Sequence, residues 1–144
     1  MQEYLSHSSN ETFELGRKFG QVLSVPTVVC FFGELAAGKT TFIKGLVSGA
    51  AQVDPCNVQS PTFTYLHIYE GKKKVYHFDL YRLRDIDEFL SMGFDEYFDA
   101  DGICCVEWSE RIASYLPPNC LHVVLKHVRE DERLVTIKGF SNRL

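Results

Sequence analysis

The pattern of apolar and polar positions predicts a chain that alternates between strands and helices. Thr27 to Phe32 is a short run of apolar, β-branched and aromatic residues, which is typical of a buried strand. Apolar residues recur at helical spacing from Phe42 to Ala50, which predicts an amphipathic helix. The same spacing over residues 11–23 predicts an earlier helix. Four polar residues are candidates for its N-cap: Ser8, Ser9, Asn10 and Thr12.

The second half of the chain continues this alternation. Ile103 to Val106 is apolar throughout, as expected for a strand buried on both faces of a parallel sheet. Three further pairs of elements are predicted: hairpin strands over 64–69 and 75–80, short helices over 82–92 and 109–115, and terminal hairpin strands over 121–128 and 134–137.

These elements predict an α/β fold. We expect a three-layer sandwich of the P-loop NTPase type, with hairpins and a mixed, largely parallel central sheet. The chain has 144 residues without a repeat or an internal linker, so we expect one domain over residues 1–144. Ligands of such folds bind at the carboxyl ends of the parallel strands.

A phosphate-binding motif lies between the predicted strand and its helix. Residues 33–40, Gly-Glu-Leu-Ala-Ala-Gly-Lys-Thr, fit the P-loop pattern G-x-x-x-x-G-K-[ST]. In this motif backbone N–H groups converge on a phosphate at a helix N-terminus, where the helix dipole favours an anion. Lys39 would add a positive charge near the β- and γ-phosphates, and Thr40 would offer a hydroxyl to Mg²⁺. The motif therefore predicts nucleotide binding.

A P-loop enzyme also needs an acid at the end of a neighbouring strand. Asp79 and Glu107 both follow predicted strands, and each could instead be a strand-end surface charge. We favour Glu107 for the metal because its strand is more uniformly apolar, with Asp79 organising a water molecule. Thr62, in a proline-containing loop, is either a γ-phosphate sensor or the start of a strand.

Other residues are left undecided by the sequence. Trp108 is either an aromatic lid or part of the core. His67 and His77 alternate with apolar residues, so they are interpreted as sheet residues rather than metal ligands. Three arginines could neutralise transition-state charge, and nothing distinguishes them: Arg82, Arg84 and Arg111.

Composition excludes several kinds of partner. The net charge of −4 argues against a protein that grips nucleic acid by itself, and Lys72 to Lys74 is interpreted as a solvated turn. Five cysteines without a C-x-x-C pair predict buried free thiols, no disulfide-linked partner and a cytoplasmic location. Met1 to Asn10 is polar and unlike a signal peptide, and no apolar run is long enough to span a membrane.

Four motifs, in this order and in so short a chain, resemble those of the TsaE family (formerly YjeE). They are the P-loop with Thr41, Ser-Pro-Thr-Phe at 60–63, His-Phe-Asp-Leu-Tyr-Arg-Leu at 77–83, and Glu-Trp at 107–108. Members of this family are bacterial P-loop ATPases needed to make threonylcarbamoyladenosine in tRNA. One position departs from the family pattern, because Ala36 replaces the first glycine of Gly-Ala-Gly-Lys-Thr.

The resemblance implies specific roles for residues of this chain. Thr40 and Glu107 would coordinate Mg²⁺, and Asp79 and Thr62 would be needed for hydrolysis together with Lys39. Ser8 and Thr12 would lie near the nucleotide. The residues implied to bind ATP directly are Leu35, Ala36, Ala37, Gly38, Lys39, Thr40 and Thr41.

The resemblance also implies a partner. Such a protein binds the TsaD–TsaB heterodimer, which transfers threonylcarbamoyl to adenosine, and uses ATP hydrolysis to reset that complex. Contact with tRNA would then be indirect, and hydrolysis by the isolated protein slow. Three alternatives stay open: a small-molecule kinase, a GTPase-like switch (although N-K-x-D is missing) and a nucleotide-gated binding subunit without significant turnover.

Overall fold

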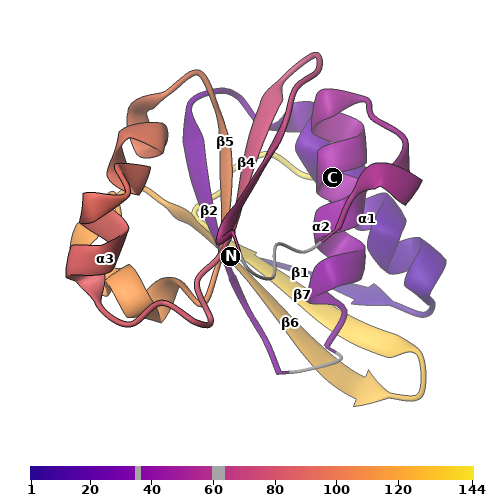
Figure 1. Ribbon diagram of the computed structural model, residues 1–144. Helices are drawn as coiled ribbons and strands as arrows, with labels where there is room; N and C mark the ends of the chain where they lie inside the picture. The colour runs from indigo at the N-terminus through magenta and orange to yellow at the C-terminus, as the bar shows by residue number, and fades with distance from the viewer. Residues whose placement is uncertain (35–36, 60–63) are drawn as a thin grey trace.

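The computed structural model describes residues 1–34, 37–59 and 64–144. In this part of the chain, strands form a seven-stranded sheet in the order β1-β7-β6-β2-β5-β4-β3 (Figure 1). The strands are β1 (Gln2–Ser6), β2 (Thr27–Phe32), β3 (Leu66–Tyr69), β4 (Lys74–Asp79), β5 (Gly102–Glu107), β6 (Leu121–Arg129) and β7 (Glu132–Lys138).

Helices cover both faces of this sheet, as Figure 1 shows. On one face α1 and α2 pack over a core cluster that includes Val29 and Ile103, and on the other α3 and the 3₁₀ segments η2 and η3 pack over a second cluster that includes Phe78. The predicted three-layer α/β fold is therefore confirmed. The helical segments are α1 (Ser9–Val22), α2 (Lys39–Ala51), η1 (Pro55–Asn57), α3 (Ile86–Ser91), η2 (Phe94–Asp99) and η3 (Ser109–Tyr115).

The centre of the sheet is parallel and its edges are antiparallel. Strand β2 pairs in parallel with both β5 and β6, and β5 pairs in parallel with β4. The two predicted hairpins are present as the antiparallel pairs β3–β4 and β6–β7. Strand β5 lies between β2 and β4 and is buried along its whole length, as its continuous apolar run predicts.

Helices α1 and α2 run parallel and approach each other so closely that glycine is needed between them. A Cβ atom on Gly20 would lie 2.2 Å from the carbonyl oxygen of Leu46, and one on Gly45 would lie 2.1 Å from that of Phe13. These distances leave no space for a side chain. Because the helices are parallel, the N-terminal ends of both lie at the same end of the sheet.

Strand β1 is missing from the prediction, in which residues 1–10 are only a polar segment. It pairs antiparallel with β7, with Tyr4 opposite Val135. Its buried positions are polar, since Gln2 and Ser6 face inward while Leu5 is 50% exposed. The Gln2 amide donates to the carbonyl oxygens of Phe140 and Asn142, at 2.9 and 2.7 Å. Because polar residues face inward and an apolar residue faces outward, a hydropathy pattern does not detect this strand.

Helix α3 is shorter than the predicted helix over 82–92. It begins after Asp85, whose side chain accepts a hydrogen bond from the N–H of Glu88 at 2.9 Å. This N-cap sets the start of the helix more strongly than the apolar spacing that extends before it. Residues 109–115 form a 3₁₀ segment instead of an α-helix. Similarly, β3 begins at Leu66 because Tyr65 has a left-handed backbone with φ +62°.

Lys73 corrects the interpretation of Lys72 to Lys74 as a solvated turn. Its ammonium group donates to three carbonyl oxygens at the end of α1, those of Gly20, Gln21 and Leu23, at 3.2, 2.8 and 2.6 Å. Burial lowers the pKa of Lys73, with a smaller contribution from neighbouring Lys72. The turn between β3 and β4 therefore stabilises the C-terminus of α1.

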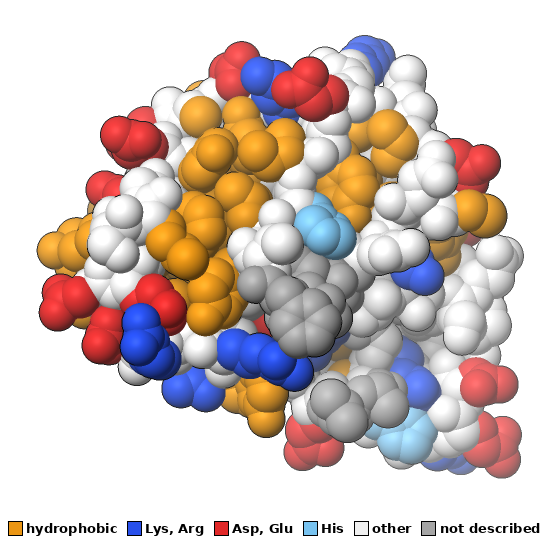
Figure 2. All heavy atoms as spheres, viewed as in Figure 1, with side chains coloured by type: hydrophobic (Ala, Val, Ile, Leu, Met, Phe, Trp, Pro, Cys, Tyr) orange, Lys and Arg blue, Asp and Glu red, His pale blue; other side chains and the backbone are white. Residues whose placement is uncertain are grey.

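Hydrophobic side chains gather on the face shown in Figure 2, towards the side of the molecule that carries α3. The exposed large apolar side chains include Ile68 on β3, at 45%, and Met92 after α3, at 48%. Strand β3 is also an edge strand of the sheet. The sheet thus ends at β3 with an apolar side chain open to solvent.

Candidate functional site

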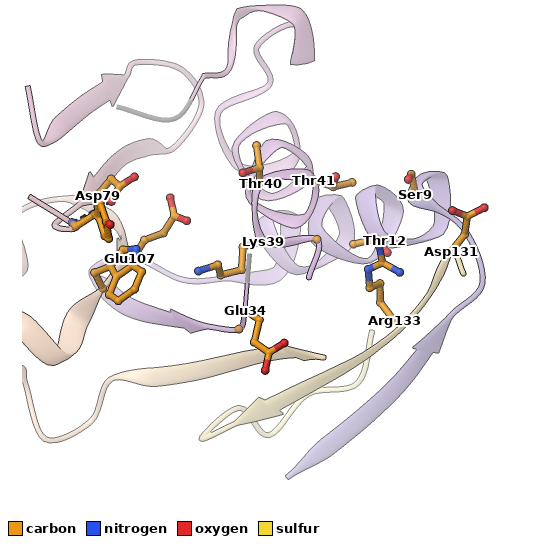
Figure 3. A pocket seen from close by; sticks show the side chains of 14 residues that line it. Ser9, Thr12, Glu34, Lys39, Thr40, Thr41, Asp79, Glu107, Asp131 and Arg133 are labelled. Carbon is orange, nitrogen blue, oxygen red and sulfur yellow. Dashed lines mark hydrogen bonds between the residues drawn. The ribbon is translucent and has the colours of Figure 1, made fainter. Parts of the chain in front are cut away.

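A cavity of about 670 Å³ opens beside the N-terminus of α2, next to the ends of β2, β4 and β5. Its volume is in the range of small-molecule sites. Figure 3 shows its side chains converging from the sheet, from α1 and α2, and from the β6–β7 hairpin. The position agrees with the rule that ligands of such sheets bind at the carboxyl ends of the parallel strands.

The P-loop leads from β2 into α2 along the wall of this cavity. Gly33 has φ +150°, and a Cβ there would lie 2.6 Å from the Leu125 carbonyl oxygen, so only glycine fits. Gly38, with φ +96°, is the N-cap of α2 and makes no side-chain capping bond. Within the described residues no side chain caps the first N–H groups of α2, which leaves them available to an anion. The lining includes Gly38, Lys39, Thr40 and Thr41, whereas Ala37 is buried.

Two carboxylates enter the cavity from adjacent strands. Asp79 ends β4 and Glu107 ends β5, and the two residues are register partners. Glu107 is 5% exposed and its Oε2 lies 2.8 Å from Nε2 of His77. Oδ1 of Asp79 accepts a hydrogen bond from the N–H of Tyr81 at 3.1 Å. Burial raises the pKa of Asp79, and the Glu107 charge adds to that rise against the lowering effect of the Tyr81 bond.

The oxygen ligands present fit magnesium. Mg²⁺ is usually bound through one or two carboxylates, hydroxyls and substrate phosphates instead of an all-protein cage. The Thr40 hydroxyl and the Glu107 carboxylate are such ligands, and both line the cavity. In the described residues there is no cluster of three or more acidic, histidine or cysteine ligands.

The other end of the cavity is lined by α1 and by the β6–β7 hairpin. Ser9 and Thr12 contribute from α1, and Asp131 and Arg133 from the hairpin (Figure 3). The side chain of Ser8 is the N-cap of α1, accepting from the Glu11 N–H at 3.1 Å. Of the two residues expected near the nucleotide, Thr12 thus lines the cavity and Ser8 caps the helix beside it.

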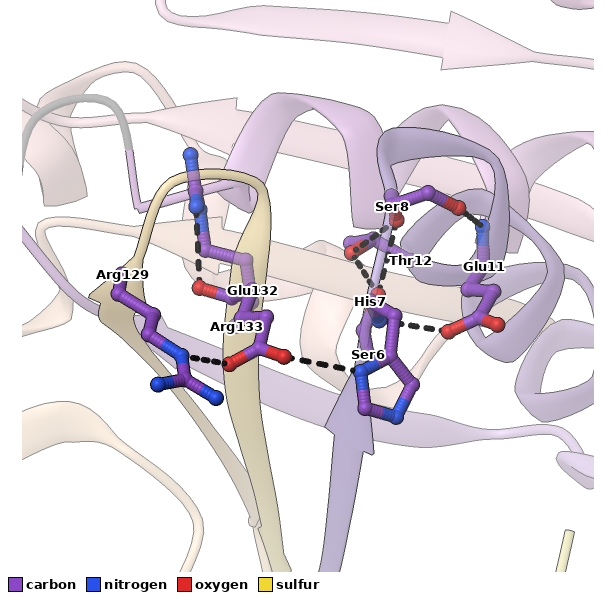
Figure 4. Close-up of polar contacts among 8 residues, drawn as sticks. All are labelled: Ser6, His7, Ser8, Glu11, Thr12, Arg129, Glu132 and Arg133. Carbon is purple, nitrogen blue, oxygen red and sulfur yellow. Dashed lines mark hydrogen bonds and ion pairs between the residues drawn. The ribbon is translucent and has the colours of Figure 1, made fainter.

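Polar contacts join this helix start to the hairpin (Figure 4). Glu132 on β7 lies 3.1 Å from Nδ1 of His7 and accepts a hydrogen bond from Nε of Arg129 at 2.9 Å. These neighbours lower the pKa of Glu132, with the His7 hydrogen bond as the largest cause. At the same helix start the hydroxyls of Ser6 and Thr12 lie 2.7 Å apart. The contacts thus tie the hairpin, which carries Arg133, to the first turn of α1.

Trp108 belongs to both the cavity wall and the core. It lines the cavity, packs partly buried against the second core cluster and has a left-handed backbone with φ +60°. The ammonium of Lys39 lies 5.6 Å from its ring centroid, and the ring of Tyr81 lies 5.0 Å away. The lid and core interpretations are therefore compatible.

Not every predicted residue reaches the cavity. Among the described residues that line it, Arg133 is the arginine, and the three candidates Arg82, Arg84 and Arg111 are not in the lining. Arg111 instead lies 5.9 Å from the ring of Trp108, and Arg84 pairs with Glu88. Leu35, Ala36 and Thr62 lie outside the described residues, so their roles stay predictions.

Sequence reasoning missed Ser9, Tyr81, Asp131 and Arg133 as cavity residues. Residues 129–132 are interpreted there only as a charged turn, and Arg133 follows that turn. The signal that would have found Ser9, Asp131 and Arg133 is the pairing of β1 with β7, which brings the hairpin to the start of α1. His67 and His77 lie in strands, as predicted, although the contact of His77 with Glu107 was not foreseen.

Comparison with known proteins adds decisive information. A family model described as "Threonylcarbamoyl adenosine biosynthesis protein TsaE" matches residues 6–135. This chain belongs to the TsaE family. It is 38% identical over 133 residues to the tRNA threonylcarbamoyladenosine biosynthesis protein TsaE of Treponema pallidum, covering 92% of this chain and 97% of that one. It is 43% identical over 117 residues to TsaE of Bacillus subtilis, covering 81% and 72%.

The fold comparison agrees with the TsaE assignment. The crystal structure of Bacillus subtilis YdiB matches with a TM-score of 0.76 and 31% sequence identity, over 94% of this chain and 83% of that one. The resemblance to TsaE noted from four motifs is thus confirmed, and with it a family role in the biosynthesis of threonylcarbamoyladenosine in tRNA. Among the described residues, none of the helices has the length and apolar character needed to cross a membrane.

Proposed function

We propose that this TsaE-family protein binds ATP with Mg²⁺ and hydrolyses it slowly in support of the TsaD–TsaB heterodimer. The observation that carries the proposal is the composition of one cavity. An uncapped helix N-terminus with Lys39 and Thr40 faces two strand-end carboxylates, Asp79 and Glu107. This combination is the recurring arrangement of P-loop NTPases.

Phosphate binding would fall to the start of α2. Its free N–H groups point along the helix axis, and Lys39 contributes a full positive charge to the β- and γ-phosphates. Thr40 and Glu107 would hold Mg²⁺, which neutralises charge on the phosphate oxygens when bound. The end lined by Ser9, Thr12 and Arg133 is left for the nucleoside.

Asp79 is the candidate for activating water. Its Oδ1 is occupied by the Tyr81 N–H, which leaves Oδ2 to orient a water molecule and accept its proton. The pKa of Asp79 is raised by burial, so its carboxylate is a better base than an exposed aspartate. Thr62 remains a predicted contributor to the same step.

The positions of the arginine side chains suggest that ATP hydrolysis depends on a partner protein. Among the described residues of the lining, Arg133 lies at the end away from Asp79 and Glu107 (Figure 3), and the three arginines considered for transition-state stabilisation are not part of it, so the isolated protein would hydrolyse ATP slowly. Contact with TsaD–TsaB would complete or alter the site. The net charge of −4 supports contact with tRNA only through that complex, and the five free cysteines favour a cytoplasmic location.

Phosphate release from ATP with Mg²⁺ tests the proposal. The rate of phosphate release is measured for the wild type alone, for the wild type with purified TsaD–TsaB, and for the Lys39→Ala variant. We expect a slow basal rate that the partners change and that Lys39→Ala abolishes. A rate indifferent to the partners would contradict the partner assignment. Transfer of phosphate to a small acceptor would indicate a kinase. Tighter binding of GTP than of ATP would indicate a GTPase-like switch, and control of the partners without turnover would indicate a nucleotide-gated subunit.

A further inference from the structure

A buried histidine contacts the carboxylate assigned to the metal. His77 is 1% exposed and Glu107 is 5% exposed, and Nε2 of His77 lies 2.8 Å from Oε2 of Glu107. The two residues come from adjacent parallel strands, β4 and β5. His77 lies two residues before Asp79, so alternation places both side chains on one face of β4.

His77 lies in a mainly apolar layer of the sheet, next to its cross-strand neighbour His67. On the same face of the sheet lie Val75 of β4 and Ile103 and Cys105 of β5, which belong to the core cluster beneath α1 and α2. Cys105 is the register partner of His77. Burying an imidazole in such a layer costs free energy unless its polar atoms are paired. An apolar side chain would fill this position at lower cost, so packing alone does not account for the histidine.

The hydrogen bond determines where the imidazole proton lies. As a Mg²⁺ ligand Glu107 would be ionised, and an ionised carboxylate can only accept, so the Nε2–H of His77 would donate the hydrogen bond to Oε2 of Glu107. Nδ1 is buried and has no hydrogen-bond partner among the described residues. The His77 side chain thus makes its hydrogen bond to Oε2 of Glu107. Oε1 of Glu107 is left for a ligand in the cavity.

We propose that His77 is a positioning residue, which holds the Glu107 carboxylate in the orientation that binds Mg²⁺ beside Thr40. The inference rests on the proposed function, because it assumes that Glu107 is a magnesium ligand. Carboxylate ligands are commonly oriented by an outer hydrogen bond, and loss of such a bond lowers metal affinity about 10- to 100-fold. His77 touches neither phosphate nor metal in this scheme, and acts through Glu107.

A matched pair of variants tests the hydrogen bond. His77→Gln keeps a donor near the position of Nε2, whereas His77→Met has similar length and volume without a donor. Binding of a fluorescent ATP analogue is titrated at increasing Mg²⁺ and, separately, in EDTA. Thermal unfolding of each variant without ligand reports on the fold. His67→Met is the control, because His67 is the direct cross-strand neighbour of His77 on β3 and lies outside the cavity.

We expect His77→Met to require about 10- to 100-fold more Mg²⁺ for half-maximal enhancement of binding, with unchanged affinity in EDTA. His77→Gln should recover most of the loss, and His67→Met should match the wild type. Equal Mg²⁺ requirements of folded His77→Gln and His77→Met would overturn the proposal. So would an equal loss of affinity in EDTA, which would mean that His77 maintains the whole cavity.

Two results separate this inference from the proposed function. A wild type whose nucleotide affinity ignores Mg²⁺ would refute the magnesium role of Glu107 itself. A wild type that needs Mg²⁺ together with a His77→Met variant that needs it equally would refute only the role of His77. If His77→Met fails to fold, ¹⁵N–¹H spectra of the wild-type histidines still test the proposal, because they show which ring nitrogen of His77 carries a proton. A proton on Nδ1 and none on Nε2 would contradict the assigned hydrogen bond.

Discussion

Asp79 and Glu107 are direct neighbours across the parallel pair β4–β5, and their side chains enter the same cavity. Their surroundings nevertheless differ. Glu107 is almost completely buried and is bonded to an imidazole, while Asp79 is half-buried and is bonded to a backbone N–H. Glu107 is thus held by the side chain of His77, whereas Asp79 is held by a backbone N–H of the turn that follows it. This difference favours different roles for the two acids.

Exchanging each acid for its amide should separate these roles. Glu107→Gln is expected to lose the Mg²⁺-dependent part of nucleotide binding, about tenfold or more, because an amide is a weaker magnesium ligand. Asp79→Asn should retain binding and lose about 100-fold or more in turnover, because its amide cannot accept the proton of water. Calorimetric titration with Mg²⁺ and with EDTA, together with phosphate release, measures both. Loss of Mg²⁺-dependent binding in Asp79→Asn and loss of turnover alone in Glu107→Gln would reverse the roles assigned to the two acids.

Asp79 should also lower stability at neutral pH. Burial raises its pKa above the ordinary 3.8, so the folded state binds the proton more strongly than the unfolded state. Stability is therefore greatest below the ordinary pKa and is lost as pH rises through the raised value. In EDTA, Asp79→Asn should unfold at a higher temperature than the wild type at pH 7, and the difference should shrink towards pH 4. A constant difference across this range would contradict the burial argument.

The close packing of α1 on α2 predicts a large effect of one methyl group. Gly20→Ala would place Cβ 2.2 Å from the Leu46 carbonyl oxygen, which forces the two helices apart. We expect a loss of about 2 kcal/mol in the free energy of unfolding, after the gain in helix propensity is subtracted. Urea denaturation followed by circular dichroism measures it. The exposed neighbour is the control, since Gln21→Ala should change stability by less than about 0.5 kcal/mol.

The lysine at the β3–β4 turn predicts a second stability effect. Lys73→Met removes a donor to the three carbonyl oxygens at the end of α1, and should cost about 1–2 kcal/mol. Lys72→Met changes the same charge at an exposed position and should cost little. Urea denaturation of the two variants gives the comparison. Equal losses would show that net charge, and not the capping of α1, is responsible.

Where the hydropathy pattern is strong, the sequence predicts the fold well. Residues 28–32 of β2 and 103–106 of β5 are apolar throughout, and α2 repeats its apolar residues with helical spacing, so these elements appear where expected. The P-loop and the two strand-end acids follow from them, because parallel strands bring their carboxyl ends together. The phosphate end of the cavity could thus be predicted from local patterns and topology.

The opposite end could not be predicted, for a physical reason. Arg133 reaches the cavity from a hairpin that is held between β2 and β1, and its pairing with β1 brings it to α1. Strand β1 buries Gln2 and Ser6 and exposes Leu5, so its inward positions are satisfied by hydrogen bonds instead of apolar contacts. A pattern based on hydrophobicity cannot detect such a strand. The same limit concealed His77, whose partner is thirty residues away.

The glycine contacts between α1 and α2 determine what can move when a ligand enters. Thr12 and Thr40 lie in the first turns of these two helices, whose backbones touch without intervening side chains. Close packing of this kind resists relative movement of the two helices, so the wall that carries both threonines is a firm part of the cavity. Adjustment to a ligand is then expected first in the side chains of the wall and in the β6–β7 hairpin.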